Sequence, residues 1–429
     1  MLFNGGCIIY IIDFCRTPFS KSFTFLKDYT SLDLIGFAVG YLIEKTDLDP
    51  SFLSNIILGN VVPFLKGPNI AREVIFHLNL PGKISGYTIS AACISGLRAV
   101  TSAMEEIKSG KSELIIAGGV ESISNMPVTY RETFIRSMFK ARREKSPFAR
   151  LYLFAKANPL RNFFPEIPQF QEHSTGLKMG DYAEMLAEKF DISRQAMDEF
   201  ALQSHRKAAR ATKEGKYKSD IIKLSLPTGE EIDSDTTIRE DTSMEKLSEL
   251  RPAFKKDGRV TAGNASPPTD GAAVVLLASE KMVEKGFTPQ ARIKDYAYAT
   301  TNNREELLLG SAYAISELLR AENLSLSDID VFELHEAFAS QVIATIKCLN
   351  AEPQNPIIPD FLPPEGRLEE SRLNLYGGSI SLGHPFSATG IRLIMNAVNA
   401  LKEIKGNYAV AASCAAGGLG AALLIENID

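Results

Sequence analysis

The chain has 429 residues, of which 45 % are hydrophobic and 23 % are charged, and its net charge is −5 at pH 7. These values are typical of a globular protein with two or three closely packed domains, and the mean hydropathy of −0.04 gives no reason to expect a chain embedded in a bilayer. The negative net charge and the pI near 5.8 argue against wholesale nucleic-acid binding.

The five cysteines are spread along the chain. They show neither the dense framework of a disulfide-rich secreted protein nor the paired spacing of a metal site, so we expect a cytoplasmic location and no metal centre. The first cysteine opens an apolar run at residues 7–12. This run is too short to span a membrane, and no basic stretch precedes it as in a signal peptide. This run predicts a buried strand that ends at Asp13, and we expect Cys7, Cys15 and Cys348 to be core residues.

The next informative segment places a cysteine just before a predicted helix: Thr88-Ile-Ser-Ala-Ala-Cys93-Ile-Ser-Gly96. Amide donors and the dipole at a helix start stabilise negative charge, so a cysteine there can have a lowered pKa and act as a nucleophile near neutral pH. A lone cysteine among small residues is otherwise usually a buried core residue. Cys93 is therefore a candidate nucleophile, with core packing as the alternative.

Short strand-like runs at residues 113–117 and 408–412 follow helical stretches, which predicts the α/β class. A weak repeat supports this prediction, because Gly96-Leu-Arg98 and Gly390-Ile-Arg392 each open an amphipathic helix that leads into a small-residue strand. Chance similarity between common helix residues is the alternative to an internal duplication.

Between Pro127 and about Pro252 the chain becomes charged and irregular, which predicts an inserted domain. A polar helix is expected near residues 193–213, capped by Ser193, with Ala196, Phe200 and Ala201 on one face, and we interpret it as a solvated surface helix. The expected organisation is an N-terminal half at 1–127 that continues at about 256–285, an inserted loop domain at 128–255, and a C-terminal half at 286–429.

One part of the insertion differs in charge from the rest of the chain. From Arg131 to Arg161 there are nine basic and two acidic residues, a net charge of +7, interleaved with aromatic and aliphatic side chains. This pattern predicts an amphipathic surface helix or helical hairpin over residues 131–164 that makes peripheral membrane contact or docks to a partner. A cover for an acyl chain is the alternative.

Two segments near the C-terminus complete a possible acid/base set. Asn374-Leu-Tyr-Gly-Gly-Ser-Ile-Ser-Leu-Gly-His384-Pro-Phe-Ser-Ala-Thr-Gly390 places a histidine among glycines, and histidine can take the proton of a thiol at neutral pH. Ser413-Cys414-Ala-Ala-Gly-Gly-Leu-Gly420 offers a second thiol beside a glycine-rich turn. The histidines without a motif, which we expect to be structural or exposed, are His77, His173 and His205.

These three segments, in this order, resemble the signature segments of the thiolase family, and the similarity covers nearly the whole chain. Further segments similar to thiolase landmarks are Arg16-Thr-Pro-Phe19, Gly59-Asn-Val61, Ala117-Gly-Gly-Val-Glu-Ser122, Leu250-Arg-Pro-Ala-Phe254 and Thr261-Ala-Gly-Asn-Ala-Ser266. The resemblance implies a duplicated five-layer αβαβα fold, with the inserted loop domain covering the CoA side. It also implies thiolytic cleavage of 3-ketoacyl-CoA in fatty acid β-oxidation, CoA as co-substrate with no bound cofactor, and a homodimer or larger homo-oligomer.

By this resemblance, Cys93 accepts the acyl group, His384 activates it, and Cys414 is the acid and base at the substrate's α carbon. The backbone amides of Cys93 and Ala416 would hold the thioester oxygen. His335 stands where many thiolases carry asparagine and would stabilise an oxyanion together with His384, either directly or through water. The His-Glu-Ala-Phe form is similar to the β subunit of the trifunctional complex, which implies a hydratase/dehydrogenase α subunit as a possible partner.

The resemblance also assigns CoA contacts, namely Lys178, Met179, Arg239 and Ser266. Arg239 could equally be a solvated surface charge. The alternatives for the activity are a biosynthetic acetoacetyl-CoA thiolase and, less similar, a ketoacyl synthase or hydroxymethylglutaryl-CoA-type synthase. From another class, the chain could be a non-catalytic lipid-binding protein with this fold. The paired Cys93 and Cys414 favour a thiolase.

Overall fold

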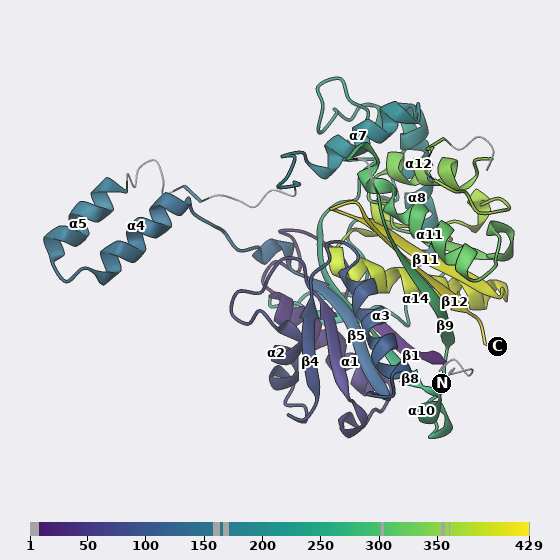
Figure 1. The fold of residues 1–429 in the computed structure, drawn as a ribbon, viewed down its shortest axis with the longest axis horizontal. Coiled ribbons are helices and arrows are strands. Elements are labelled where there is room, and N and C mark those ends of the chain that lie inside the picture. The colour runs from purple at the N-terminus through teal and green to yellow at the C-terminus, as the bar shows by residue number, and fades with distance from the viewer. Residues whose placement is uncertain are drawn as a thin grey trace. The chain divides into compact units, whose positions relative to one another are not determined.

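The computed structural model describes residues 8–157, 164–165, 171–301, 304–352, 357–359 and 361–428 (Figure 1). They form two compact units, one from Met1–Asn125 with Met179–Asp429 and the other from Met126–Lys178. No helix in the described ranges is long and apolar enough to cross a membrane. Cys7 lies outside the described residues, and the predicted domain boundaries at 127, 255 and 285 stay predictions.

The larger unit is built on a mixed sheet with the strand order β4-β3-β5-β8-β1-β9-β12-β11-β10, and β2 pairs with β8 at its side. Strands β3, β4 and β5 are parallel to one another, as are β10 and β11. The strands are β1 (Ile9–Arg16), β2 (Ser20–Lys21), β3 (Asn55–Gly59), β4 (Ser85–Ile89), β5 (Leu114–Glu121), β8 (Thr269–Ser279), β9 (Ala291–Thr300), β10 (Val331–Leu334), β11 (Tyr408–Ala415) and β12 (Leu419–Glu426), with β6 (Leu224–Ser225) and β7 (Glu231–Ile232) as a separate ribbon. The α/β class is confirmed.

The prediction that the first strand ends at Asp13 is wrong, because β1 continues through Asp13 to Arg16. The pairing of β1 with β8 shifts between Ile11 and Asp13, a local irregularity that lets the carboxylate leave the sheet. There the carboxylate of Asp13 accepts a hydrogen bond of 2.7 Å from Nζ of Lys45. A paired acid at an irregularity therefore does not end the strand.

Helices cover both faces of each half of the sheet, and because α3 and α14 lie between the two halves, the fold has five layers (Figure 1). Alternate strand residues point to opposite faces, so Leu114 and Ile116 of β5 pack with the outer helices α1 and α2, while Ile115 packs with α3 and α14. Helix α14 also packs on β11 of the second half, whose other face carries α11. The five-layer duplicated fold is confirmed.

The helices of the larger unit are α1 (Ser31–Lys45), α2 (Ile70–His77), α3 (Ser95–Lys108), α7 (Met179–Lys189), α8 (Arg194–Lys213), α9 (Met244–Ser248), α10 (Glu280–Glu284), α11 (Gly310–Ala321), α12 (Ala339–Leu349), α13 (Ser379–Leu382) and α14 (Phe386–Ile404). Short 3-10 turns in the described ranges are η1 (Pro50–Phe52), η2 (Ile123–Asn125), η3 (Arg304–Leu309), η4 (Leu326–Asp328) and η5 (Glu370–Arg372).

The two central helices approach each other through the glycines of the predicted repeat. A Cβ on Gly96 of α3 would overlap the carbonyl oxygen of Ser387, and a Cβ on Gly390 of α14 would lie 2.8 Å from Cγ of Leu97. Any larger residue would push the helices apart. This close crossing places the start of α3 beside the start of α14, and with them the segments that carry the candidate nucleophile and its histidine.

Helix α8 begins after Ser193, whose hydroxyl accepts a hydrogen bond of 3.1 Å from the N–H of Ala196, as expected. It is not a solvated surface helix, because one face of it is buried against α12 and α13. That face is formed by residues such as Met197 and Ala201, whereas Ala196 and Phe200 are only half-buried. Alanine and serine on this face pack closely, which a search for large apolar residues does not detect.

The smaller unit contains α4 (Glu132–Arg143) and α5 (Pro147–Lys156), which pack against each other as a helical hairpin. Ser146 caps α5, and Pro147 occupies its first turn. The predicted hairpin is confirmed for the described residues 131–157, whereas residues 158–163 lie outside the described part of the chain.

Candidate active site

Cys93 lies in a strained turn between β4 and α3. Ala92, the residue before it, has φ of 48°, in the left-handed region that residues other than glycine seldom adopt. Ser95 stabilises the turn, since its hydroxyl accepts from the N–H of Ala91 and donates to the carbonyl of Ala92, each at 2.7 Å. The turn presents the half-buried thiol at the start of α3.

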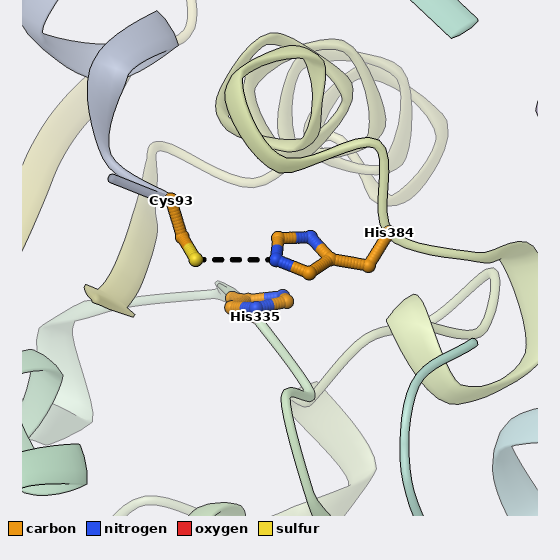
Figure 2. Close-up of side chains that lie close together, drawn as sticks. All are labelled: Cys93, His335 and His384. Carbon is orange, nitrogen blue, oxygen red and sulfur yellow. Dashed lines mark hydrogen bonds between the residues drawn. The ribbon is translucent and has the colours of Figure 1, made fainter. Parts of the chain in front are cut away.

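His384 comes from the loop that precedes α14. Its Nε2 lies 3.2 Å from Sγ of Cys93, and its Nδ1 lies 2.7 Å from Oγ1 of Thr389 (Figure 2). Gly383 before it has φ of 93°, and a Cβ there would overlap the side chain of Thr269, so only glycine fits. If Nε2 accepts the thiol proton, Nδ1 must carry a hydrogen and donate it to Thr389.

His335 lies beside this pair (Figure 2). It follows β10, and its backbone N–H donates to the carbonyl of Ala412 at 2.9 Å, which continues the pairing of β10 with β11 past the end of β10. The rings of His335 and His384 pack together with centroids 4.1 Å apart and an angle of 36° between their planes. Nδ1 of His335 lies 2.8 Å from Oγ of Ser379. Among the described residues, Nε2 of His335 has no hydrogen-bond partner, although the ring is buried.

Cys414 and Ala416 approach Cys93 from the end of β11. Cys414 is buried in the strand, and the charge of a Cys93 thiolate would raise the pKa of its thiol further than burial alone does. The backbone N–H groups of Ala416 and Cys93 donate to the sulfur of Cys93 and so favour its thiolate. The structure thus brings Cys93, His384, His335, Cys414 and the amide of Ala416 together from both halves of the fold.

Burial decides the protonation of the resting pair. It raises the pKa of the Cys93 thiol to about 12, which outweighs the opposing effect of the Ala416 and Cys93 amides. Burial, and then the charge of Arg392, lower the pKa of His384 to about 3. The predicted lowering of the Cys93 pKa is therefore wrong. Both shifts favour a neutral thiol and a neutral imidazole when no substrate is bound.

Three possible ligand atoms of this cluster are also close enough to one another to hold a metal ion. Sγ of Cys93 and one ring nitrogen each of His335 and His384 lie within 4.8 Å of one another. The hydrogen bond between Sγ of Cys93 and Nε2 of His384 and the packing of the two histidine rings account for that proximity.

Glu121, within the predicted landmark at 117–122, supports the site although its role was not predicted. The oxygens of its buried carboxyl group accept hydrogen bonds from the N–H groups of Val61 and Val62 at 2.7 and 2.9 Å and from the hydroxyl of Ser387 at 2.8 Å. Burial raises its pKa to about 8. Glu121 therefore joins the first turn of α14 to the end of β3. The sequence signal that could have identified Glu121 is a single acidic residue in a strand of small residues.

The predicted CoA contacts come from separate segments of the chain. Arg239 is exposed and lines a hollow of about 450 Å³, where its backbone N–H donates to Nδ1 of His205 at 3.1 Å. The hydroxyl of Ser266 donates to the carbonyl of Ala337 at 3.1 Å. Met179 begins α7, whereas Lys178 is exposed and ends the smaller unit.

The cysteines and histidines outside the site, where the structure describes them, have the burial that we expected. Cys15 and Cys348 are buried in the core, His77 and His173 are exposed, and His205 is buried and structural. Burial, and then Arg239, lower the pKa of His205 to about 4.

Two family models match the chain, the thiolase N-terminal domain over residues 9–281 and the thiolase C-terminal domain over residues 287–427. The Caenorhabditis elegans protein named "Probable 3-ketoacyl-CoA thiolase" is 41 % identical over 431 residues, which cover 97 % of this chain and 94 % of that protein. The mitochondrial trifunctional enzyme subunit beta of Bos taurus is 39 % identical over 425 residues, covering 97 % and 88 %. The crystal structure of human mitochondrial 3-ketoacyl-CoA thiolase in complex with CoA is 31 % identical with a TM-score of 0.84, covering 98 % of both chains.

Proposed function

The chain belongs to the thiolase family, and we propose that it is a 3-ketoacyl-CoA thiolase that works in fatty acid β-oxidation. It cleaves 3-ketoacyl-CoA with CoA, its co-substrate, to give acetyl-CoA and a shortened acyl-CoA. The observation that carries this proposal is the contact of 3.2 Å between Sγ of Cys93 and Nε2 of His384, with Cys414 close by. A second thiol beside the nucleophile suits an enzyme that must also move a proton to and from carbon.

In the first half-reaction, the thiol of Cys93 gives its proton to Nε2 of His384 as Sγ attacks the 3-keto carbon. The N–H groups of His384 and His335 stabilise the oxyanion that forms. The bond between C2 and C3 then breaks, its electron pair goes to C2, and the thiol of Cys414 protonates that carbon. Acetyl-CoA leaves, and the rest of the acyl chain stays on Cys93 as a thioester.

In the second half-reaction, the thiolate of Cys414 takes the proton of incoming CoA. The CoA thiolate attacks the thioester, whose oxygen is held by the backbone N–H groups of Cys93 and Ala416. Cys93 leaves as a thiolate and recovers its proton from His384, which restores the neutral pair. The low pKa of His384 favours this return, because a buried imidazolium gives up its proton readily.

We expect thiolysis of 3-ketoacyl-CoAs within chain lengths of about four to sixteen carbons, and activity that rises with length would support the role in β-oxidation. The measurement is the loss of the 3-ketoacyl-CoA after addition of CoA. Activity confined to acetoacetyl-CoA would support the biosynthetic thiolase instead. A folded protein that binds acyl-CoA but cleaves none of these substrates would support the non-catalytic lipid-binding alternative.

For CoA, we propose contacts with Lys178, Met179, Arg239 and Ser266. Exposed Arg239 beside a hollow with other basic side chains suits the phosphate groups of CoA. An Arg239→Gln variant is expected to raise KM for CoA with little change in kcat, and an unchanged KM would leave Arg239 as a solvated surface charge.

We propose that the chain forms a homodimer through the edge strand β4. None of its five residues is buried, whereas all five residues of the neighbouring β3 are. Such an edge offers unpaired backbone donors and acceptors to a second strand, and a two-fold axis would let two copies of β4 pair. Light scattering should give twice the mass of one chain, and a monomer at micromolar concentration contradicts the proposal.

The hairpin of the smaller unit carries an apolar stripe and a strong positive charge. Phe148, Leu151 and Tyr152 share one face of α5 and are 85, 67 and 66 % exposed. Residues 131–157 include eight basic and two acidic side chains. We propose that this hairpin binds an anionic lipid surface, because apolar groups would enter the acyl boundary while the cations meet the headgroups.

Co-sedimentation with vesicles tests this proposal. The full chain should pellet with vesicles that contain phosphatidylglycerol and not with phosphatidylcholine alone, and replacement of Phe148 and Leu151 by serine should abolish pelleting. The matched control replaces Phe52 and Phe76, exposed aromatic residues of the larger unit, and should leave pelleting unchanged. If wild type does not pellet, the lipid proposal fails and a hydratase/dehydrogenase α subunit becomes the expected occupant.

We also propose a location for the chain in the cell. A cytoplasmic location, with the chain peripheral on the inner membrane face, follows from the cysteine usage and the hairpin. The relatives named trifunctional enzyme subunit beta support assembly with an α subunit, and their names place them in mitochondria. Recovery of the chain with organelle markers on cell fractionation would contradict the cytoplasmic location.

A further inference from the structure

A buried set of side chains behind His335 determines which of its ring nitrogens carries the proton. Oγ of Ser379 lies 2.8 Å from Nδ1 of His335 and 2.7 Å from Nη2 of Arg392. All three side chains are buried. They come from three elements, since His335 follows β10, Ser379 opens α13 and Arg392 lies in α14.

The donors and acceptors of these groups leave one arrangement in which the hydrogen of the Ser379 hydroxyl has an acceptor. A guanidinium can only donate, so Oγ of Ser379 accepts from Arg392. The single hydrogen of the Ser379 hydroxyl is then free to be donated to Nδ1 of His335. If Nδ1 carried the proton instead, the oxygen would accept from both His335 and Arg392 with its two lone pairs. The hydroxyl hydrogen would then need another acceptor, and none is found for it among the described residues.

The orientation of Arg392 is itself maintained from β10. Nη1 of Arg392 lies 3.4 Å from Oε2 of Glu333, two residues before His335 in the chain, and the amide of Asn396 approaches the same oxygen at 3.4 Å. Burial is the largest cause that lowers the pKa of both His335 and His384, the charge of His384 comes next for His335, and the positive charge of Arg392 lowers both pKa values further. His335 is therefore a neutral ring with one hydrogen.

We propose that Ser379, oriented by Arg392, is a positioning residue that holds His335 in the tautomer with hydrogen on Nε2, so that this N–H donates directly to the oxyanion formed beside Cys93. The inference rests on the proposed thiolase function. Nε2 is the ring nitrogen with no hydrogen-bond partner among the described residues, and the ring lies against His384 (Figure 2). A buried donor without a partner is poised for a charge that appears only during the reaction.

The two histidines would then act as opposite tautomers. His384 carries hydrogen on Nδ1 and accepts the Cys93 proton on Nε2, whereas His335 carries hydrogen on Nε2 from the start. After attack, both Nε2 atoms bear hydrogen and both can donate to the same oxygen. No bridging water is then required.

Nitrogen-15 spectroscopy of histidine-labelled protein tests the tautomer without any turnover. The chain has five histidines, and His335→Asn assigns the signals of His335. We expect hydrogen on Nε2 and none on Nδ1 in wild type, a changed Nδ1 signal in Ser379→Ala, and the wild-type pattern in Ser379→Thr, which keeps the hydroxyl. Hydrogen on Nδ1 in wild type, or an unchanged Nδ1 signal in Ser379→Ala, would overturn the proposal.

Kinetics tests whether Ser379 acts through His335. Loss of a whole oxyanion donor costs about 10²–10³ in kcat, so loss of its orientation is expected to cost about tenfold in Ser379→Ala, with KM for CoA unchanged. In a His335→Ala background the same change should cost nothing more. An equal loss in both backgrounds would show a merely structural role and overturn the proposal. Inactive wild type would instead refute the thiolase function, and the spectroscopic result would still decide the tautomer.

Discussion

Replacement of Cys93 by alanine is expected to lower kcat for thiolysis of 3-ketoacyl-CoA by about 10⁴-fold or more. The loss is large because the acyl group then has no atom to which it can be transferred, and the groups that remain can only bind and polarise the substrate. The measurement is steady-state thiolysis, together with mass spectrometry of the protein after mixing with 3-ketoacyl-CoA in the absence of CoA. Wild type should gain the mass of the shortened acyl group, and Cys93→Ala should gain none.

The matched control is Cys348→Ala, which removes a buried thiol of the core outside the site cluster. It should keep both the activity and the mass gain, although the removed sulfur leaves a small cavity and lowers stability slightly. If Cys93→Ala still forms an acylated protein, another residue is the nucleophile. In that case the proposed roles of His384 and Cys414 fail with it.

The sequence predicted candidate site segments because each one is short and its chemistry is local. Cys93 before a helix, His384 among glycines and Cys414 before a glycine turn could be selected as candidates from residue type and spacing, whereas their proposed roles came from the resemblance to thiolases. The α/β class and the repeat were likewise visible, since Gly96 and Gly390 mark the crossing of α3 with α14. Each of these features is recognised from a short segment of the sequence.

The sequence failed where distant parts of the chain decide the outcome. The helix start at α3 predicted a lowered pKa for Cys93, but burial between the two halves raises it, and no single segment reveals that burial. Ser379 and Arg392 could not be assigned, because their contact with His335 exists only after α13, α14 and β10 have packed. The buried face of α8 was missed for the same reason.

Replacement of Cys414 by alanine is expected to slow proton transfer to carbon far more than proton transfer from the CoA thiol. Carbon–carbon cleavage is expected to fall by about 10²–10⁴-fold, because the carbanion at C2 is a strong base that needs a positioned acid. Exchange of labelled CoA into an acyl-CoA should fall far less, since a CoA thiolate can form and leave without the help of Cys414. The measurements are thiolysis and this exchange on the same preparation.

The raised pKa of Cys414 supports its proposed role as the acid that protonates the α carbon. Burial, and then the charge of Cys93, raise the pKa of this thiol, so it holds its proton until a base as strong as the carbanion appears. Once deprotonated, the same thiolate is strong enough to remove a proton from the α carbon of acetyl-CoA in the reverse direction. Cys414→Ala should therefore also lose exchange of the acetyl-CoA methyl protons with deuterated water. If thiolysis and CoA exchange fall equally, or if the methyl protons still exchange, Cys414 is not the group that carries the proton to carbon.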